Sequence, residues 1–334
     1  MMKRFLPLFL IIVLPFSSCS KSLTKSVKHI QLEKQRQVKV LISAPDESRW
    51  QHEAENIVRI AQGFSIDFTT DLIPSTEDGH MLQRDSIVKH VHAGYRYIIL
   101  IAFDSAHASS IVAEAKRFND QIKFIAYDRP VANADIDLFI TSDSLNIGML
   151  QAQYLYSKVG AGRYLLLSGD PGDENAKGFR QGALNYFRPL IASRRVTIVG
   201  DRAIAGWTAE NAKRIVLDYI RSGVGFDAIL CPSDGPALGV IDALSTVGLA
   251  GKIPITGLDG LKSALEDIDA GYQIMTIYKD SHLYAMSAVN AILLYEQKLV
   301  PFYDSLVFNG LKDVPTHNID VTIIDKNNLS RYKK

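Results

Sequence analysis

The sequence is short of several features that define protein classes, and each shortage excludes a class. It has only 2 cysteines in 334 residues, so a disulfide framework cannot hold the chain together. Its 37 Lys and Arg nearly balance its 36 Asp and Glu, and the net charge of +1 argues against a broad nucleic-acid surface. What remains, 47% apolar and 22% charged residues, is typical of a globular protein long enough for two domains.

Motifs for phosphate loops and metal sites are also missing. The chain contains no GxxxxGK[ST], HExxH or CxxC pattern, and its 8 histidines are scattered along it. We therefore expect no metal and no cofactor.

The longest apolar run lies at the start of the chain. Phe5–Phe16 spans twelve residues, too few for a helix to cross a hydrocarbon core of ~30 Å. Lys3 and Arg4 precede the run and small residues end at Cys19, so we interpret residues 1–19 as a signal peptide. The Ser-Ser-Cys ending resembles the lipobox of bacterial lipoproteins, which implies a lipid on Cys19; the alternative is a plain secretory signal with an incidental cysteine.

Residues 20–37 are rich in Lys, Ser and Gln, a composition that favours a tether between a lipid and a folded domain. If Cys19 carries lipid, Cys231 is left without a partner. Cys231 ends an apolar run with no flanking histidine, which predicts a small buried side chain rather than a reactive thiol.

From residue 38 onward, apolar β-branched runs alternate with segments of helical spacing. Strands that are apolar on both faces and alternate with helices predict parallel sheets covered on both sides, here two doubly wound lobes. We expect an N-terminal lobe of residues 38–141 plus 277–298 and a C-terminal lobe of 142–276 plus 299–326, joined by a hinge. The predicted strands are Val38–Ile42, Ser65–Phe68, Tyr97–Ile101, Ile122–Ala126, Leu138–Thr141, Tyr164–Leu167, Val196–Val199, Ala228–Leu230, Ile253–Thr256 and Gln273–Tyr278.

Polar and aromatic side chains follow these strands, at the edge where open α/β sheets bind ligands. Carboxylates, amides and a guanidinium group can each make paired hydrogen bonds to neighbouring hydroxyls, and a Trp face suits the apolar side of a sugar ring. The residues that follow the strands include Arg49, Trp50, Asp104, Asp128, Arg129, Asn175, Trp207, Ser233, Asp234, Asp259 and Lys279.

Several of these residues lie in motifs that resemble one family. The motifs are Tyr127-Asp128-Arg129, Ala134-Asp135-Ile136-Asp137, Gly148-Met149-Leu150-Gln151-Ala152, Asp173-Glu174-Asn175-Ala176-Lys177, Gly206-Trp207, Glu210-Asn211-Ala212 and Gly248-Leu249-Ala250-Gly251-Lys252. Together, from Val38 to Lys298, they look like the bacterial periplasmic D-xylose-binding proteins. The resemblance implies the type I periplasmic binding protein fold, which closes on a monosaccharide and presents it to an ABC transporter.

The resemblance also implies sugar contacts at the matched positions, Asp128, Arg129, Asn175, Trp207, Asp259 and Lys279. The sequence departs from the family at three places. Ser233 replaces a usual Asn ahead of Asp234, the first loop keeps Arg49-Trp50 but is shortened, and Phe103-Asp104 replaces a Tyr-Asn pair. Such changes alter which sugar hydroxyl finds a partner, so they bear on the choice of sugar.

Simpler roles remain open for these residues. Asp128 and Arg129 could form a surface ion pair, Trp207 could be ordinary helix-start packing, and Asp234 and Asp259 could be helix N-caps. Lys279 could merely neutralise hinge carboxylates.

We therefore expect a periplasmic, lipid-anchored, monomeric sugar-binding protein that performs no chemistry. Its partner is an ABC permease or, alternatively, a membrane sensor kinase, because the same lobes serve either. A sugar-processing enzyme is the rival of another class, but Arg129 and Lys279 would keep nearby carboxylates ionised and leave no general acid.

Overall fold

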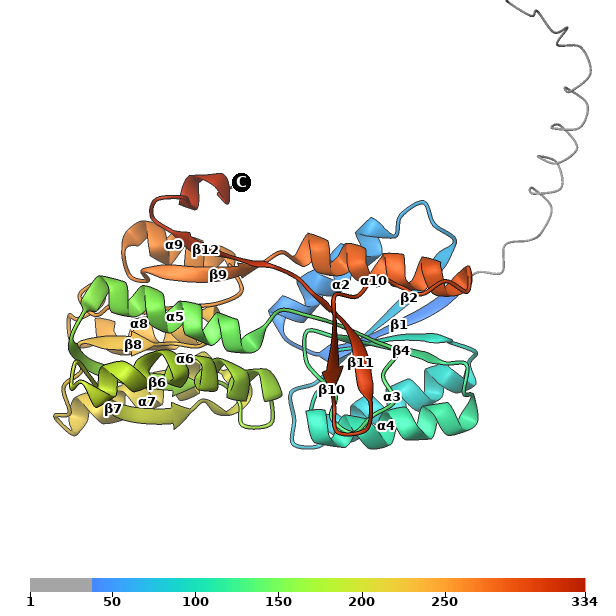
Figure 1. The fold of residues 1–334 in the computed structure, drawn as a ribbon, viewed down its shortest axis with the longest axis horizontal. Coiled ribbons are helices and arrows are strands. Elements are labelled where there is room, and N and C mark those ends of the chain that lie inside the picture. Colours follow the sequence, from blue (N-terminus) through green and yellow to red (C-terminus); the bar gives the residue numbers. More distant parts are fainter. Residues whose placement is uncertain (1–37, 334) are drawn as a thin grey trace, which may run out of the picture.

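The computed structural model describes residues 38–333, which form two lobes side by side (Figure 1). The expected signal peptide, Cys19 and the tether lie outside the described residues. Within the described part, no helix is both long and apolar enough to cross a bilayer.

The N-terminal lobe is built on a seven-stranded sheet in the order β10-β11-β5-β4-β3-β1-β2. All neighbouring pairs are parallel except β10 with β11. Every residue of β3 and β5 is buried, as their unbroken apolar sequences predict. The strands are β1 (Val38–Pro45), β2 (Ile66–Ile73), β3 (Tyr97–Leu100), β4 (Lys123–Tyr127), β5 (Leu138–Thr141), β10 (Ser305–Phe308) and β11 (Asp313–Asn318).

Helices cover both faces of this sheet. On one face α2 (Ser48–Ile60) and α10 (Ser281–Glu296) share an apolar core with the strands, around residues such as Trp50 and Tyr284. On the other face α3 (Gly79–His92) and α4 (Ser105–Phe118) close a second core. The lobe is therefore doubly wound, as expected.

The C-terminal lobe repeats this plan with shorter pieces of sheet. Its strands β7-β6-β8 form one sheet and β12-β9 another, and single bridges from Ile229 to Ile255 and from Leu258 to Ile277 connect them. The elements are α5 (Ser144–Val159), β6 (Gly162–Ser168), α6 (Glu174–Ala192), β7 (Val196–Ala203), η1 (Ala205–Trp207), α7 (Ala209–Arg221), β8 (Ala228–Leu230), α8 (Asp234–Ser245), α9 (Lys262–Ala270), β9 (Met275–Lys279), β12 (Val321–Asp325) and η2 (Leu329–Arg331).

The lobe boundaries differ from those predicted after residue 276. β9 belongs to the C-terminal lobe, including its residues 277–279. β10 and β11, predicted in the C-terminal lobe, instead extend the N-terminal sheet beside β5, and only β12 of the 299–326 segment joins the C-terminal lobe. Residues 253–256 form no full strand, since only Ile255 makes a bridge. Strand partners this distant in sequence depend on the assembled sheet edges, which local patterns do not reveal.

Three crossings join the lobes in the described chain, between β5 and α5, between β9 and α10, and between β11 and β12 (Figure 1). The Ser142 hydroxyl ties two of them together, because it donates to the carbonyl oxygen of Ile319 at 2.7 Å and lies 2.7 Å from the hydroxyl of Tyr284. Several connecting segments that pass between the lobes at one place form a hinge.

Candidate functional site

A cavity of about 350 Å³ lies between the lobes. Its volume falls in the usual range for small-molecule pockets, ~300–1,000 Å³. Nine of the eleven predicted ligand residues line it, namely Arg49, Trp50, Asp128, Arg129, Asn175, Trp207, Ser233, Asp259 and Lys279.

Both lobes contribute because the carboxyl ends of their parallel strands meet there. From the N-terminal lobe, the first turn of α2 supplies Arg49 and Trp50, and the turn directly after β4 supplies Asp128 and Arg129. The C-terminal lobe supplies the others from the start of α6, η1, the start of α8, the 257–261 loop and the end of β9.

Asp128 is the centre of a buried charge cluster. Its Oδ1 atom lies 2.9 Å from Nη2 of Arg49 and 2.8 Å from Nζ of Lys279. Burial alone would raise the pKa of Asp128, but Arg49 and Lys279 outweigh burial and hold that pKa well below its usual range. Arg49 also reaches the other lobe, since its Nη1 atom lies 3.1 Å from Oδ1 of Asp259.

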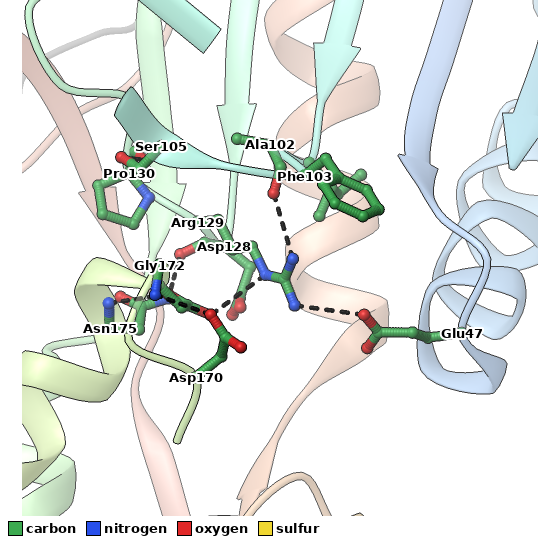
Figure 2. Close-up of polar contacts among 12 residues, drawn as sticks. Glu47, Ala102, Phe103, Ser105, Asp128, Arg129, Pro130, Asp170, Gly172 and Asn175 are labelled. Carbon is green, nitrogen blue, oxygen red and sulfur yellow. Dashed lines mark hydrogen bonds and ion pairs between the residues drawn. The ribbon is translucent and has the colours of Figure 1, made fainter. Parts of the chain in front are cut away.

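Arg129 is held in place by its own lobe. Figure 2 shows its guanidinium group between the carbonyl oxygen of Ala102, to which Nη1 donates at 3.2 Å, and Glu47, at 3.5 Å. Across the cavity, Nδ2 of Asn175 donates to the carbonyl oxygen of Asp128 at 2.8 Å (Figure 2). The turn that carries Asp128 and Arg129 therefore contacts both lobes.

The two tryptophans lie differently. Trp50 is 2% exposed and packs beside the guanidinium groups of Arg49 and Arg129, whose central carbons are 4.2 and 5.3 Å from its ring centroid. Trp207 is half-buried, with its ring edge-on to Phe179. A side chain at Gly169 would place its Cβ 1.9 Å from the Trp207 ring, so only glycine lets the indole lie there.

Three residues that line the cavity have left-handed backbone although none is glycine, namely Asp128 (φ 62°), Trp207 (φ 56°) and Asp259 (φ 103°). Such conformations cost ~1–3 kcal/mol and persist where the surrounding structure fixes them, often at functional sites.

Polar atoms around the cavity lack hydrogen-bond partners within the described residues. Nε of Arg129 and Oδ1 of Asp259 make no hydrogen bond of good geometry, although each has an ion-pair contact, with Asp173 at 3.2 Å and with Arg49 at 3.1 Å. Nε1 of Trp50 and Nε1 of Trp207 are buried with no partner among the described residues. Leaving such atoms unpaired costs ~1–3 kcal/mol each. The cavity therefore offers both donors and an acceptor to a ligand.

Two predicted ligand residues do not line the cavity. Asp234 is 1% exposed, and its carboxylate accepts hydrogen bonds from Gln273, Thr276 and the amide of Leu261. Burial and the charge of Asp259 raise its pKa to about 7. Asp234 is the first residue of α8, and its carboxylate lies outside the cavity lining. Through the amide of Leu261 it stabilises the loop that follows Asp259.

Asp104 is the N-cap of α4, where its Oδ1 atom accepts from the amides of Ala106 and His107 at 2.9 and 2.8 Å. Burial works to raise the pKa of Asp104, but these amides and the His107 ring lower it overall. Asp104 therefore has a structural role, because it caps helix α4.

Sequence reasoning did not select two carboxylates near the charge cluster. Asp173 lines the cavity beside Asn175 and had a signal, because it follows a strand in the same motif. Glu53 lies on α2 and accepts from the hydroxyl of Tyr127 at 2.6 Å. Burial raises the pKa of Glu53 to about 7, against the opposing effects of Arg49 and Tyr127. A polar residue inside an amphipathic helix gave no sign of its burial.

In the described part of the chain, no group of three or more His, Cys, Asp or Glu side chains is arranged to hold a metal ion. Cys231 is buried, and burial raises the pKa of its thiol, consistent with a packed rather than a reactive side chain.

Comparison with known proteins decides the family. Residues 38–298 match the family described as "Periplasmic binding protein domain". The chain belongs to the periplasmic binding protein family. Its fold is the type I periplasmic binding protein fold, so the predicted fold class is confirmed.

Individual relatives in this family include sugar-binding proteins. The chain is 34% identical to the D-xylose-binding periplasmic protein of Escherichia coli strain K12, over 84% of each chain. It is 32% identical to the protein of the same name from Haemophilus influenzae, again over 84% of each chain. These relatives confirm the resemblance to D-xylose-binding proteins.

Solved structures agree with this assignment. The chain superposes with a TM-score of 0.78 on an ABC transporter solute-binding protein from Clostridium phytofermentans that holds β-D-glucose. The two are 26% identical, and the match covers 88% of this chain and 96% of the other.

Proposed function

We propose that this protein binds a monosaccharide, a xylose-like aldose, between its two lobes and closes on it. The observation that carries the proposal is the cavity itself, in which each lobe offers a buried indole donor without a partner, Nε1 of Trp50 and Nε1 of Trp207, beside the carboxylate acceptors of Asp128 and Asp259. A small ligand with many hydroxyl groups would satisfy both kinds of atom. The relatives named for D-xylose binding and the relative holding β-D-glucose support the ligand class.

The proposed roles follow from chemistry and position. The carboxylates of Asp128 and Asp259 accept hydrogen bonds from sugar hydroxyls, while Arg129, Lys279 and Asn175 donate, and charged partners make such bonds stronger. Trp207 offers a flat apolar surface to the ring. Closure excludes water, which strengthens each of these bonds.

We further propose that the protein binds its sugar without transforming it. Catalysis of glycoside hydrolysis needs one carboxylic acid that is protonated near neutral pH. Glu53 and Asp234, whose pKa values burial raises to about 7, do not line the cavity. Asp128 lines it, and Arg49 and Lys279 hold the pKa of Asp128 well below its usual range against the effect of burial, so it stays ionised. An ionised group in that position is suited to accepting hydrogen bonds.

The proposal extends to location and partner. Lipid on Cys19 would hold the protein at a membrane surface in the periplasm, as a monomer that delivers sugar to an ABC permease. Support for the transporter role comes from the solved relative described as an ABC transporter solute-binding protein. No nucleic acid is expected among its partners.

Isothermal titration with D-xylose, L-arabinose, D-ribose and D-glucose tests the sugar proposal. We expect saturable binding of at least one sugar with a stoichiometry of one. The variant to compare with the wild type is Asp128→Asn, which keeps the side-chain shape but removes its charge. It should bind that sugar at least tenfold more weakly. Absence of heat and of any thermal shift with all four sugars would defeat the proposal.

A further inference from the structure

The carboxylate of Asp173 contacts both lobes. As the N-cap of α6 in the C-terminal lobe, its Oδ1 atom accepts from the amide of Asn175 at 2.9 Å. Its Oδ2 atom lies 3.2 Å from Nε of Arg129 in the N-terminal lobe. The side chain of Asp173 is 8% exposed, so this ion pair is largely shielded from water.

Each partner of this pair is fixed within its own lobe. Hydrogen bonds to Ala102 and Glu47 hold the Arg129 guanidinium in the N-terminal lobe (Figure 2), and the helix cap holds Asp173 in the C-terminal lobe. Groups that are already ordered lose little entropy when they meet. Bringing the lobes together therefore forms this ion pair without first ordering either side chain.

The same end of α6 makes a second contact across the cavity. Asn175 donates to the carbonyl oxygen of Asp128, the residue before Arg129 (Figure 2). The start of α6 and the turn at residues 128–129 thus form one compact contact between the lobes, beside the sugar cavity.

Burial makes the carboxylate of Asp173 dependent on its partner. Burial raises the pKa of Asp173, and the charge of Arg129 is the largest effect that opposes this rise. Among the other charged groups that face it, Asp128 raises the pKa and Lys279 lowers it. A buried carboxylate without a cationic partner is costly, so Asp173 favours the arrangement in which Arg129 lies against it.

We infer that Asp173 is a positioning residue that latches the closed lobes through Arg129 and thereby sets how slowly the sugar leaves. The inference rests on the proposed function, because it concerns the closure that holds the sugar. An interaction made only in the closed form shifts the population toward that form, and a ligand that binds the closed form then binds more tightly.

The test compares Asp173→Asn with Glu174→Gln. Asn is as good an N-cap as Asp, so Asp173→Asn keeps the cap and removes the charge that faces Arg129. Glu174→Gln removes the same charge one residue along α6, where the side chain is exposed and pairs with Lys177.

Stopped-flow kinetics and small-angle X-ray scattering supply the readouts. Removing one partner of a buried charge pair mainly changes the dissociation rate. We expect Asp173→Asn to release sugar about tenfold faster with little change in the association rate, and to have a larger radius of gyration without sugar. Glu174→Gln should match the wild type in both measurements.

The outcomes separate the latch from the sugar site. A wild-type dissociation rate in Asp173→Asn, or a wild-type radius of gyration without sugar, would overturn the latch. If the wild type binds no sugar, the proposed function fails, while the sugar-free scattering still decides the latch. If Asp173→Asn does not fold, Asp173→Ser, another strong N-cap without charge, takes its place.

Discussion

The Nζ atom of Lys279 lies 2.8 Å from Oδ1 of Asp128, although the two residues are 151 positions apart and belong to different lobes. Both are buried, at 5% and 2% exposure. Because the same oxygen also meets Arg49, one carboxylate joins two cations from opposite sides of the cleft. Both the stability of the closed cleft and its affinity for sugar should therefore depend on Asp128.

Asp128→Asn should lower the free energy of unfolding by about 3 kcal/mol, since breaking a buried ion pair by removing one partner leaves the other charge uncompensated. Asn tolerates the left-handed backbone at this position (φ 62°), so the substitution isolates the charge. Chemical denaturation at pH 7 measures the change. Asp120→Asn, on the exposed surface of the same lobe, is the matched control and should change stability by less than ~0.5 kcal/mol. Equal stability of the two variants would show that the charge of Asp128 is not needed to compensate the buried cations.

Trp207 should report sugar binding through intrinsic fluorescence. Its ring lines the cavity and its Nε1 atom has no hydrogen-bond partner among the described residues, so a bound sugar would change its surroundings. We expect a saturable change in the wild type and a much smaller one in Trp207→Phe, which keeps only Trp50. A full signal in Trp207→Phe would assign the response to Trp50 instead.

Arg129→Ala should weaken sugar binding by ~1.5–3 kcal/mol, the usual worth of a hydrogen bond from a charged donor. Arg129→Lys keeps the charge but cannot copy the planar guanidinium that spans Ala102, Glu47 and Asp173, so it should recover only part of the loss. Titration calorimetry measures both variants. Unchanged affinity in Arg129→Ala would exclude a direct role.

Glu53 should make stability depend on pH between about 4.5 and 7. Its pKa rises from a usual 4.5 to about 7 in the folded protein because of burial, so the folded state binds the extra proton in that range. The contribution of Glu53 to the free energy of unfolding is therefore largest below pH 4.5 and is lost as the pH rises through 7. The linkage predicts a loss of about 2 kcal/mol from pH 5 to pH 7.

Glu53→Gln removes this contribution and keeps an acceptor for the hydroxyl of Tyr127. Denaturation of the wild type and of Glu53→Gln at both pH values isolates the effect. The wild type should lose about 2 kcal/mol relative to the variant between pH 5 and pH 7. Parallel pH dependence of the two proteins would show that Glu53 is ionised throughout.

The sequence predicts most of this molecule because its signals are local. Buried parallel strands have unbroken apolar sequences, and the residues after them meet at one sheet edge. The strand ends, together with the family resemblance, therefore predicted nine of the residues that line the cavity. The prediction was wrong where pairing is distant. β11 pairs with β5, which is far from it in the sequence, and β10 pairs with β11, and no local pattern favours one lobe over the other.

The sequence also did not predict the direction in which each side chain points. Ser233 and Asp234 are neighbours at the start of α8, yet Ser233 lines the cavity and Asp234 turns to Gln273 and Thr276. Glu53 gave no sign of burial, because only packing of α2 against the sheet brings it to Tyr127. Such differences depend on tertiary packing rather than on residue type.

A crystal structure of the protein grown with the best-binding sugar of the panel would show directly whether the interlobe cavity binds the sugar. We predict one sugar ring in this cavity, beside Trp207 and within hydrogen-bond distance of Asp128, Asp259 and Lys279. An empty cavity at saturating sugar, or a sugar bound elsewhere on the surface, would contradict it.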